Sequence, residues 1–138
     1  MDQRISFITL AVADLDRTRA FYVDGLGWSP ELFVPDEVLM IRAGDKLLLS
    51  LWSEHGFEAE VGPIRRGEGV VPLTLAHNVA TEAEVDEILA LAASLGAETR
   101  GPEHRDWGGY TGYFVDPDGF NWEIAVNPDE IGRLVLPD

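Results

Sequence analysis

Gly109–Val126 reads GYTGYFVDPDGFNWEIAV, and this stretch decides the fold. The run Asp116-Pro117-Asp118-Gly119 has the composition of a tight turn, because proline holds φ at about −65° and glycine accepts a positive φ without steric cost. The residues on both sides of the turn are aromatic and β-branched, as strands prefer. We therefore predict a β-hairpin across this stretch.

Glu123 is the residue of this hairpin with the clearest functional interest. Successive side chains of a strand point to opposite faces. Trp122 and Ile124 must therefore face the protein core, while Asn121 and Glu123 face the other side. A carboxylate in that position lies either in solvent or in a cavity, and the sequence leaves this choice open.

Length and composition limit the class of protein. At 138 residues the chain is one domain, or two small halves that share a core. The hydrophobic fraction of 46% is that of a folded protein, and there is no cysteine for a disulfide or a thiolate. No run approaches the roughly 18 apolar residues of a membrane span, so we expect a cytoplasmic protein without a membrane partner.

The chain is strongly acidic, with a formal net charge of −15 and Lys46 as the only lysine. Such a charge repels nucleic acid, whose binding depends on neutralising phosphates, so nucleic acid is excluded as a partner. The same charge favours a cationic ligand, although solubility alone also explains it.

The order of predicted elements repeats once along the chain. In the first half we predict strands over 5–12, 28–34, 37–42 and 46–52, with a helix from Leu15 to about Gly25 that Asp14 caps. In the second half we predict strands over 71–79 and 97–100, the opening hairpin, and a helix that starts at a Thr81/Glu84 capping box and ends near Leu95. The residues between the halves, 53–69, read as a loop or linker, and the tail over 131–136 as an edge strand.

This repetition predicts an internal duplication. The fold class is α+β: two tandem modules of strand, helix and about three strands form curved mixed or antiparallel sheets around a cavity. The modules span about 4–54 and about 70–128, with a linker at about 55–69 and a C-terminal tail at 129–138.

Several motifs together resemble a known superfamily. The run Ile8–Leu15, with Phe21-Tyr22 and Leu26-Gly27 after it, resembles the first-half signature of the vicinal oxygen chelate proteins, which include glyoxalases, bleomycin resistance proteins and extradiol dioxygenases. Asp116–Gly119 followed by Trp122-Glu123 resembles the second-half signature. The resemblance spans nearly the whole chain and implies the paired βαβββ fold and a homodimer, which is frequent in the superfamily. The run Trp107-Gly108-Gly109-Tyr110 resembles a functionally undefined branch of it.

In the metal-dependent members, the resemblance implies four ligand positions. On this chain they fall at Phe7, about Ser50, Thr74 (or Pro72 in the alternative register) and Glu123. A phenyl ring coordinates no metal, and divalent sites need three or four nitrogen, oxygen or sulfur ligands. We therefore predict no metal and no cofactor.

The residues expected to line the cavity follow from strand alternation, with Trp107 added as a lid on a glycine-rich connection. For each of them, packing or solvent contact is the alternative to ligand contact. The predicted pocket consists of Phe7, Thr9, Ser50, Trp52, Thr74, Asn78, Trp107, Tyr113, Asn121 and Glu123.

Three functions remain open. The first is binding or sequestration of a small molecule, cationic or aromatic, in a cavity with a degenerate metal site. The second is a metal-dependent lyase, isomerase or dioxygenase. The third is a metal-free enzyme that uses Glu123 as general base, because burial raises the pKa of a carboxyl group. A loop histidine, His55 or His104, is the alternative base, whereas His77 is expected on the helix-packing face.

Overall fold

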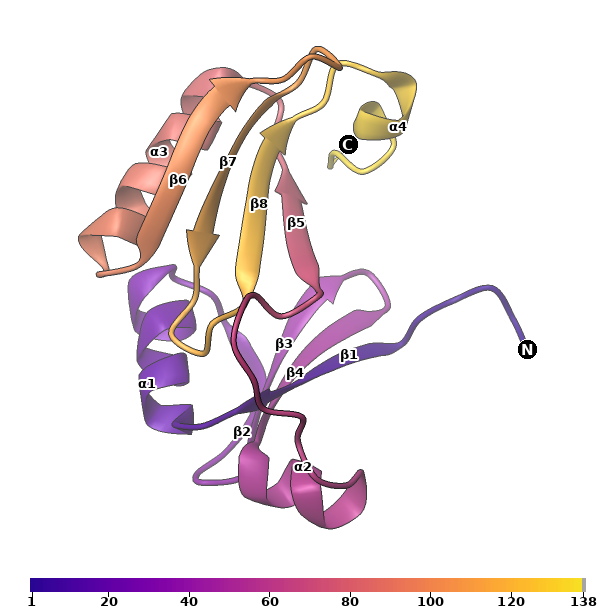
Figure 1. The fold of residues 1–138 in the computed structure, drawn as a ribbon. Helices are drawn as coiled ribbons and strands as arrows, with labels where there is room; N and C mark the ends of the chain where they lie inside the picture. The colour runs from indigo at the N-terminus through magenta and orange to yellow at the C-terminus, as the bar shows by residue number, and fades with distance from the viewer. Residues whose placement is uncertain (138) are drawn as a thin grey trace. The chain divides into compact units, whose positions relative to one another are not determined.

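The computed structural model describes residues 1–137 as an α+β fold of two similar halves (Figure 1). The elements are, in chain order, β1 (Phe7–Val12), α1 (Leu15–Arg19), the π-helix η1 (Ala20–Gly25), β2 (Pro30–Val34), β3 (Val38–Gly44), β4 (Leu47–Ser53), α2 (Glu54–Glu60), β5 (Thr74–Asn78), α3 (Glu82–Ser94), β6 (Glu98–His104), β7 (Tyr110–Val115), β8 (Asn121–Val126) and α4 (Glu130–Arg133).

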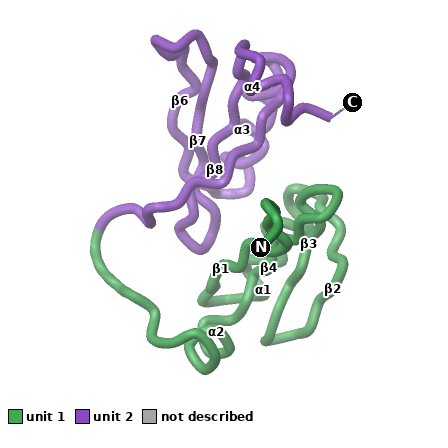
Figure 2. Tube along the Cα trace, turned by 90° about the vertical axis from the view of Figure 1, so that its right-hand side faces the viewer, with its two compact units in different colours: residues 1–68 green, residues 69–138 purple. Residues whose placement is uncertain are grey.

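The two sheets have the same topology. The strand orders are β1-β4-β3-β2 and β5-β8-β7-β6, and in each sheet the first and last strands of the half run parallel while the other pairs are antiparallel. The chain divides into two compact units, residues 1–68 and 69–138 (Figure 2). The predicted α+β class and the two modules with the same strand order are confirmed.

The predicted hairpin joins β7 to β8. The buried carboxylate of Asp116 accepts hydrogen bonds from the backbone N–H groups of Asp118 and Phe120, both at 2.9 Å. Gly119 takes a φ of +90°, as the turn requires. The turn thereby fixes the strand register, in which Tyr113 lies opposite Glu123.

Helix α3 packs on one face of the second sheet. The hydroxyl of Thr81 accepts from the backbone N–H of Glu84, while the Glu84 carboxylate accepts from the backbone N–H of Thr81, so the predicted capping box is present. Val85, Leu89 and Ala92 are buried on the sheet side of the helix. They meet the apolar side chains of the hairpin that alternate away from Glu123, among which Phe114 and Trp122 stack at 6.0 Å.

The first unit has its own core on one face of the first sheet, formed by alternating residues of β3 and β4. Leu39, Ile41, Leu49 and Leu51 are almost fully buried. The helix predicted from Leu15 to about Gly25 is present as α1 followed directly by η1, and the carboxylate of Asp14 accepts the backbone N–H of Arg17, as its predicted capping role requires.

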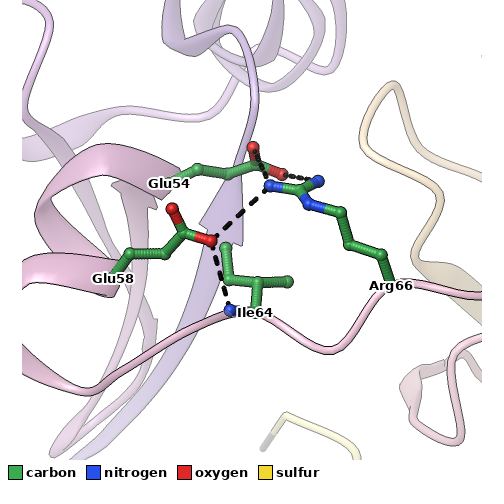
Figure 3. Close-up of polar contacts among 4 residues, drawn as sticks. All are labelled: Glu54, Glu58, Ile64 and Arg66. Atoms are coloured by element: carbon green, nitrogen blue, oxygen red, sulfur yellow. Dashed lines mark hydrogen bonds and ion pairs between the residues drawn. The ribbon is translucent and has the colours of Figure 1, made fainter.

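The segment predicted as a loop, 53–69, differs from the structure because it contains α2. The Ser53 hydroxyl caps this helix by accepting the backbone N–H of Gly56. Arg66 donates to Glu54 at 2.8 Å and lies 3.8 Å from Glu58, and Glu58 also accepts the backbone N–H of Ile64 (Figure 3). The helix therefore depends on contacts from residues that follow it.

Two further segments differ from the sequence-based expectation. The tail contains the short helix α4 rather than an edge strand, and Gly132 lies so close to Asn127 that a Cβ would approach its carbonyl oxygen at 2.4 Å. Strand β6 continues to His104, beyond the predicted end at Arg100. Among the described residues, no helix has both the length and the apolar character needed to cross a membrane.

Gly112 provides a test of the packing between α3 and β7. A Cβ at this position would lie 2.3 Å from Cδ1 of Leu89 and 3.1 Å from the backbone oxygen of Arg100. We expect Gly112→Ala to lower the free energy of unfolding by about 1–3 kcal/mol, the usual cost of overpacking, as measured by urea denaturation. Gly67→Ala is the matched control because its Cβ meets nothing within 4 Å, and equal stability of the two variants would contradict this packing.

Candidate functional site

The second sheet carries a polar cluster on the face turned away from α3. We call it the Glu123 face and define it by Arg100, Arg105, Tyr113, Asn121 and Glu123. The hydroxyl of Tyr113 donates to Oε2 of Glu123 at 3.0 Å. The two residues are directly opposite each other on β7 and β8, and both side chains are half-buried. The hairpin register therefore brings a phenol and a carboxylate together.

Arg100 enters this cluster from the edge strand β6. Its register partner is Tyr113, and its guanidinium carbon lies 5.1 Å from the centroid of the tyrosine ring. Nη2 of Arg100 also donates to Oδ1 of Asn121 at 2.7 Å, and Asn121 is only 6% exposed. A guanidinium stacked on an aromatic ring and tied to a buried amide is held in one orientation.

Arg105 approaches the same ring from the connection after β6. Its guanidinium carbon lies 6.0 Å from the centroid of Tyr113, and it also pairs with the carboxylate of Glu103. Sequence reasoning did not include Arg100 or Arg105 in the site. The available signal was their rarity, since only 10 basic residues occur in the chain and both lie close to the hairpin in sequence.

The environment of Tyr113 keeps its hydroxyl neutral. Partial burial raises the pKa of Tyr113 above its ordinary value, and the hydrogen bond to Glu123 and the negative charge of that carboxylate raise it further. Arg105 and Arg100 oppose this rise. Tyr113 is therefore a hydrogen-bond donor at neutral pH, and it orients one oxygen of Glu123.

Two other predicted pocket residues of the second unit lie on β5, the strand beside β8. Thr74 on β5 is the register partner of Asn121 and is exposed, while Asn78 is opposite Ala125 and is half-buried. Trp107 is 48% exposed, and its indole covers Gly109, where an added Cβ would lie 1.9 Å from the ring.

The predicted pocket residues of the first unit share one face of the first sheet. Thr9 is directly opposite Ser50, which is buried, and Phe7 is opposite Leu48 and is 50% exposed. Trp52 packs against Phe57 of α2 with ring centroids 6.0 Å apart. This face offers hydroxyl and aromatic groups but no charged side chain among the predicted residues.

None of the three histidines belongs to the set that defines the Glu123 face. His77 is the register partner of Ile124 and so lies on the helix-packing side of the second sheet, as expected. His55 is in α2, in the segment predicted as a loop. His104 ends β6, packs against Tyr110 with ring centroids 4.9 Å apart and lies 3.8 Å from Glu82 of α3. The Tyr110 hydroxyl donates to Asp86 at 2.9 Å, so these residues form a separate contact between α3 and the sheet.

The side chains at the four ligand positions do not fit a divalent metal. Phe7 offers only a phenyl ring, Ser50 and Thr74 offer hydroxyls, and Glu123 is the single carboxylate. Within residues 1–137, no group of three or more His, Cys, Asp or Glu side chains is placed to hold a metal ion.

Comparison with known proteins settles the family. The family model of the Glyoxalase/Bleomycin resistance protein/Dioxygenase superfamily matches residues 4–124. The chain belongs to this superfamily. The topology of the two sheets agrees with it, and the resemblance drawn from the sequence motifs is confirmed.

Solved structures from the superfamily support this placement. A glyoxalase-related enzyme from Fulvimarina pelagi is 33% identical, with 91% of this chain and 89% of that chain covered and a TM-score of 0.81. A lactoylglutathione lyase from Agrobacterium tumefaciens is 25% identical, with 91% and 95% covered and a TM-score of 0.70. A fosfomycin resistance protein from Mesorhizobium loti, 18% identical with 98% and 100% covered and a TM-score of 0.69, shares the fold. A comparison with curated proteins finds no match.

The Tyr113–Glu123 hydrogen bond gives a prediction for titration. We expect Glu123→Gln to lower the pKa of Tyr113, because the negative charge that opposes ionisation of the phenol is removed. The ionisation of each of the three tyrosines can be followed by NMR of the ring carbons. The raised pKa of Tyr113 also affects stability, because the folded protein holds the phenol proton more tightly than the unfolded chain does. The free energy of unfolding therefore falls as pH rises above about 10, and this fall should be smaller in Glu123→Gln.

Tyr110 is the internal control for this titration. The hydrogen bond from its hydroxyl to Asp86 raises its pKa in the same way. Asp86→Asn should lower the pKa of Tyr110 and leave that of Tyr113 unchanged. Glu123→Gln should lower the pKa of Tyr113 and leave that of Tyr110 unchanged. An unchanged Tyr113 pKa in Glu123→Gln would contradict the hydrogen bond.

Proposed function

We propose that this protein binds a small organic molecule on the Glu123 face and sequesters it without a metal ion. The observation that carries the proposal is the Tyr113–Glu123 pair, a half-buried donor and acceptor at 3.0 Å on one face of a sheet. Ligand sites combine aromatic side chains with a few placed polar groups, and this cluster has that composition. The superfamily includes bleomycin resistance proteins by name, which is consistent with a binding role.

A second candidate function is metal-free catalysis with Glu123 as general base. Tyr113 orients Oε2 of the carboxylate, and Oε1 makes no hydrogen bond to any residue that the structure describes. That oxygen is available to accept a proton from a bound substrate, provided that the substrate lies within hydrogen-bond distance. The glyoxalase-related enzyme from Fulvimarina pelagi makes an enzymatic role worth testing.

Ligand binding at Tyr113 can be tested with a fragment library and ligand-observed NMR. We expect the fragments that bind to lose affinity roughly tenfold or more in Tyr113→Ala, since large aromatic contacts dominate binding energy. Tyr110→Ala is the matched control: this tyrosine is also half-buried on β7, but it contacts His104 and Asp86 instead. Equal losses in both variants would count against a site on the Glu123 face.

Metal independence can be tested by elemental analysis of the purified protein. We expect zinc, iron, manganese and nickel each to be well below one per chain, and Glu123→Gln to leave these values unchanged, because one carboxylate is too few ligands. A stoichiometric metal that is lost in Glu123→Gln would show that the ion is completed by other ligands. The metal-dependent lyase, isomerase or dioxygenase would then replace this proposal.

Sequestration and metal-free catalysis are distinguished by turnover, because only a catalyst converts the bound molecule. If Glu123 is a general base, activity in a metal-free preparation disappears in Glu123→Gln while binding persists. Glu87→Gln is the matched control, since Glu87 is an exposed carboxylate on α3, which packs on the opposite face of the sheet. Homodimer formation and a cytoplasmic location remain predictions, of which the first is checked by sedimentation of the full chain.

A further inference from the structure

We infer that Arg100 is an anion-binding group, and that the ligand of the Glu123 face is a small organic acid whose carboxylate or phosphoryl group it holds. This inference rests on the proposed function and names the ligand class for it. It replaces the cationic ligand that the net charge of −15 suggests, because local groups on the Glu123 face matter more for a bound ligand than the total charge.

Arg100 differs in its partner from the arginines that form ion pairs. Ion pairs with carboxylates are formed by Arg4, Arg19, Arg42, Arg66 and Arg105. Arg100 instead donates to the neutral amide oxygen of Asn121. Among the described residues its charge is therefore not neutralised by an ion pair. The same holds for Arg133, but Arg133 lies on α4, whereas Arg100 lies beside Tyr113 and Asn121 on the Glu123 face.

The guanidinium of Arg100 is also preorganised for binding an anion. Asn121 and the ring of Tyr113 hold it at 2.7 Å and 5.1 Å, respectively. Only Nη2 has a hydrogen-bond partner among the described residues, so the donors on Nε and Nη1 remain available. A fixed guanidinium with a free edge binds a carboxylate or a phosphoryl group with two parallel hydrogen bonds, and holding it in advance lowers the entropy lost on binding.

The position of Arg100 relative to Glu123 limits the size of the ligand. Arg100, Tyr113 and Glu123 form one cross-strand row over β6, β7 and β8. Neighbouring strands are about 4.8 Å apart, so the row spans roughly 10 Å. A small acid can place its anionic group at Arg100 and a hydroxyl or other donor near Oε1 of Glu123.

Arg100 also has a structural role, because its bond to Asn121 links β6 to β8. The test must separate this role from anion binding. Arg100→Gln keeps a side-chain donor for Asn121 but removes the charge, and Arg100→Lys keeps the charge but removes the planar group. Arg133→Gln is the control in the same unit, since Arg133 is exposed and donates to the backbone oxygen of Pro128.

The experiment titrates the full chain with four probes that share a phenyl ring: phenylacetate, benzylphosphonate, phenethylammonium and phenylethanol. Inorganic phosphate is a fifth probe that distinguishes a free ion from an organic acid. Binding is followed by two-dimensional NMR at the side-chain signals of Arg100 and Asn121 and at the amides of Tyr113 and Glu123. Thermal unfolding by circular dichroism checks that each variant is folded.

We expect an anionic phenyl probe to bind more tightly than phenylethanol and phenethylammonium. Arg100→Gln should weaken that anion about tenfold or more, as expected for a charge-assisted hydrogen bond, and leave phenylethanol within about twofold. Arg100→Lys should give an intermediate loss, and Arg133→Gln none. Whichever of phenylacetate and benzylphosphonate binds more tightly shows whether Arg100 prefers a carboxylate or a phosphoryl group.

Other outcomes separate this inference from the proposed function. If phenylethanol or phenethylammonium shifts Tyr113 and Glu123 at least as strongly as the anions, the binding site stands and the acid-binding role of Arg100 is wrong. The same conclusion follows if Arg100→Gln weakens all phenyl probes equally, because the residue then acts only through the structure. If none of the probes affects these residues, both proposals are overturned.

Discussion

The hydrogen bonds that Asp116 accepts inside the β7–β8 turn are the constraint on which the second unit depends. They close a turn that aligns Phe114 with Trp122 and Tyr113 with Glu123. A slip of one residue would exchange the two faces, so that Glu123 would meet α3 and Trp122 would face away from it. The same local contact therefore sets both the apolar packing of the unit and the composition of the Glu123 face.

The electrostatics of that face differ from those of the chain as a whole. Twenty-five acidic residues against ten basic ones give the molecule a repulsive field for anions at a distance. Within the cluster, however, Glu123 is bonded to a neutral phenol and Arg100 to a neutral amide. Neither charge is cancelled by its immediate partner, and each retains its capacity for a ligand. At physiological salt the Debye length is about 8 Å, so these near groups determine what binds more than distant carboxylates do.

The parts of the structure that were predictable are those specified by neighbouring residues. The hairpin follows from the turn chemistry around Gly119, α3 from the Thr81/Glu84 box, and the face of Glu123 from strand alternation. Helix α2 was missed because glycines and mixed charges obscure it, and its stabilising contact comes from Arg66, which lies after the helix. Arg100 was missed for a similar reason: its role appears only when β6 pairs beside β7. Contacts between residues distant in sequence leave little local signal.

The duplication allows the two halves to carry different side chains on equivalent strands. Both units repeat the same strand order, and in each the helix after the first strand packs on one face of the sheet. On the opposite face of the first sheet, Trp52 contacts Phe57 of α2. The helix-packed faces must remain apolar for stability, whereas the opposite faces are free to diverge. In the first unit that face carries Phe7, Thr9 and Trp52, and in the second it carries a phenol, a carboxylate and two guanidiniums.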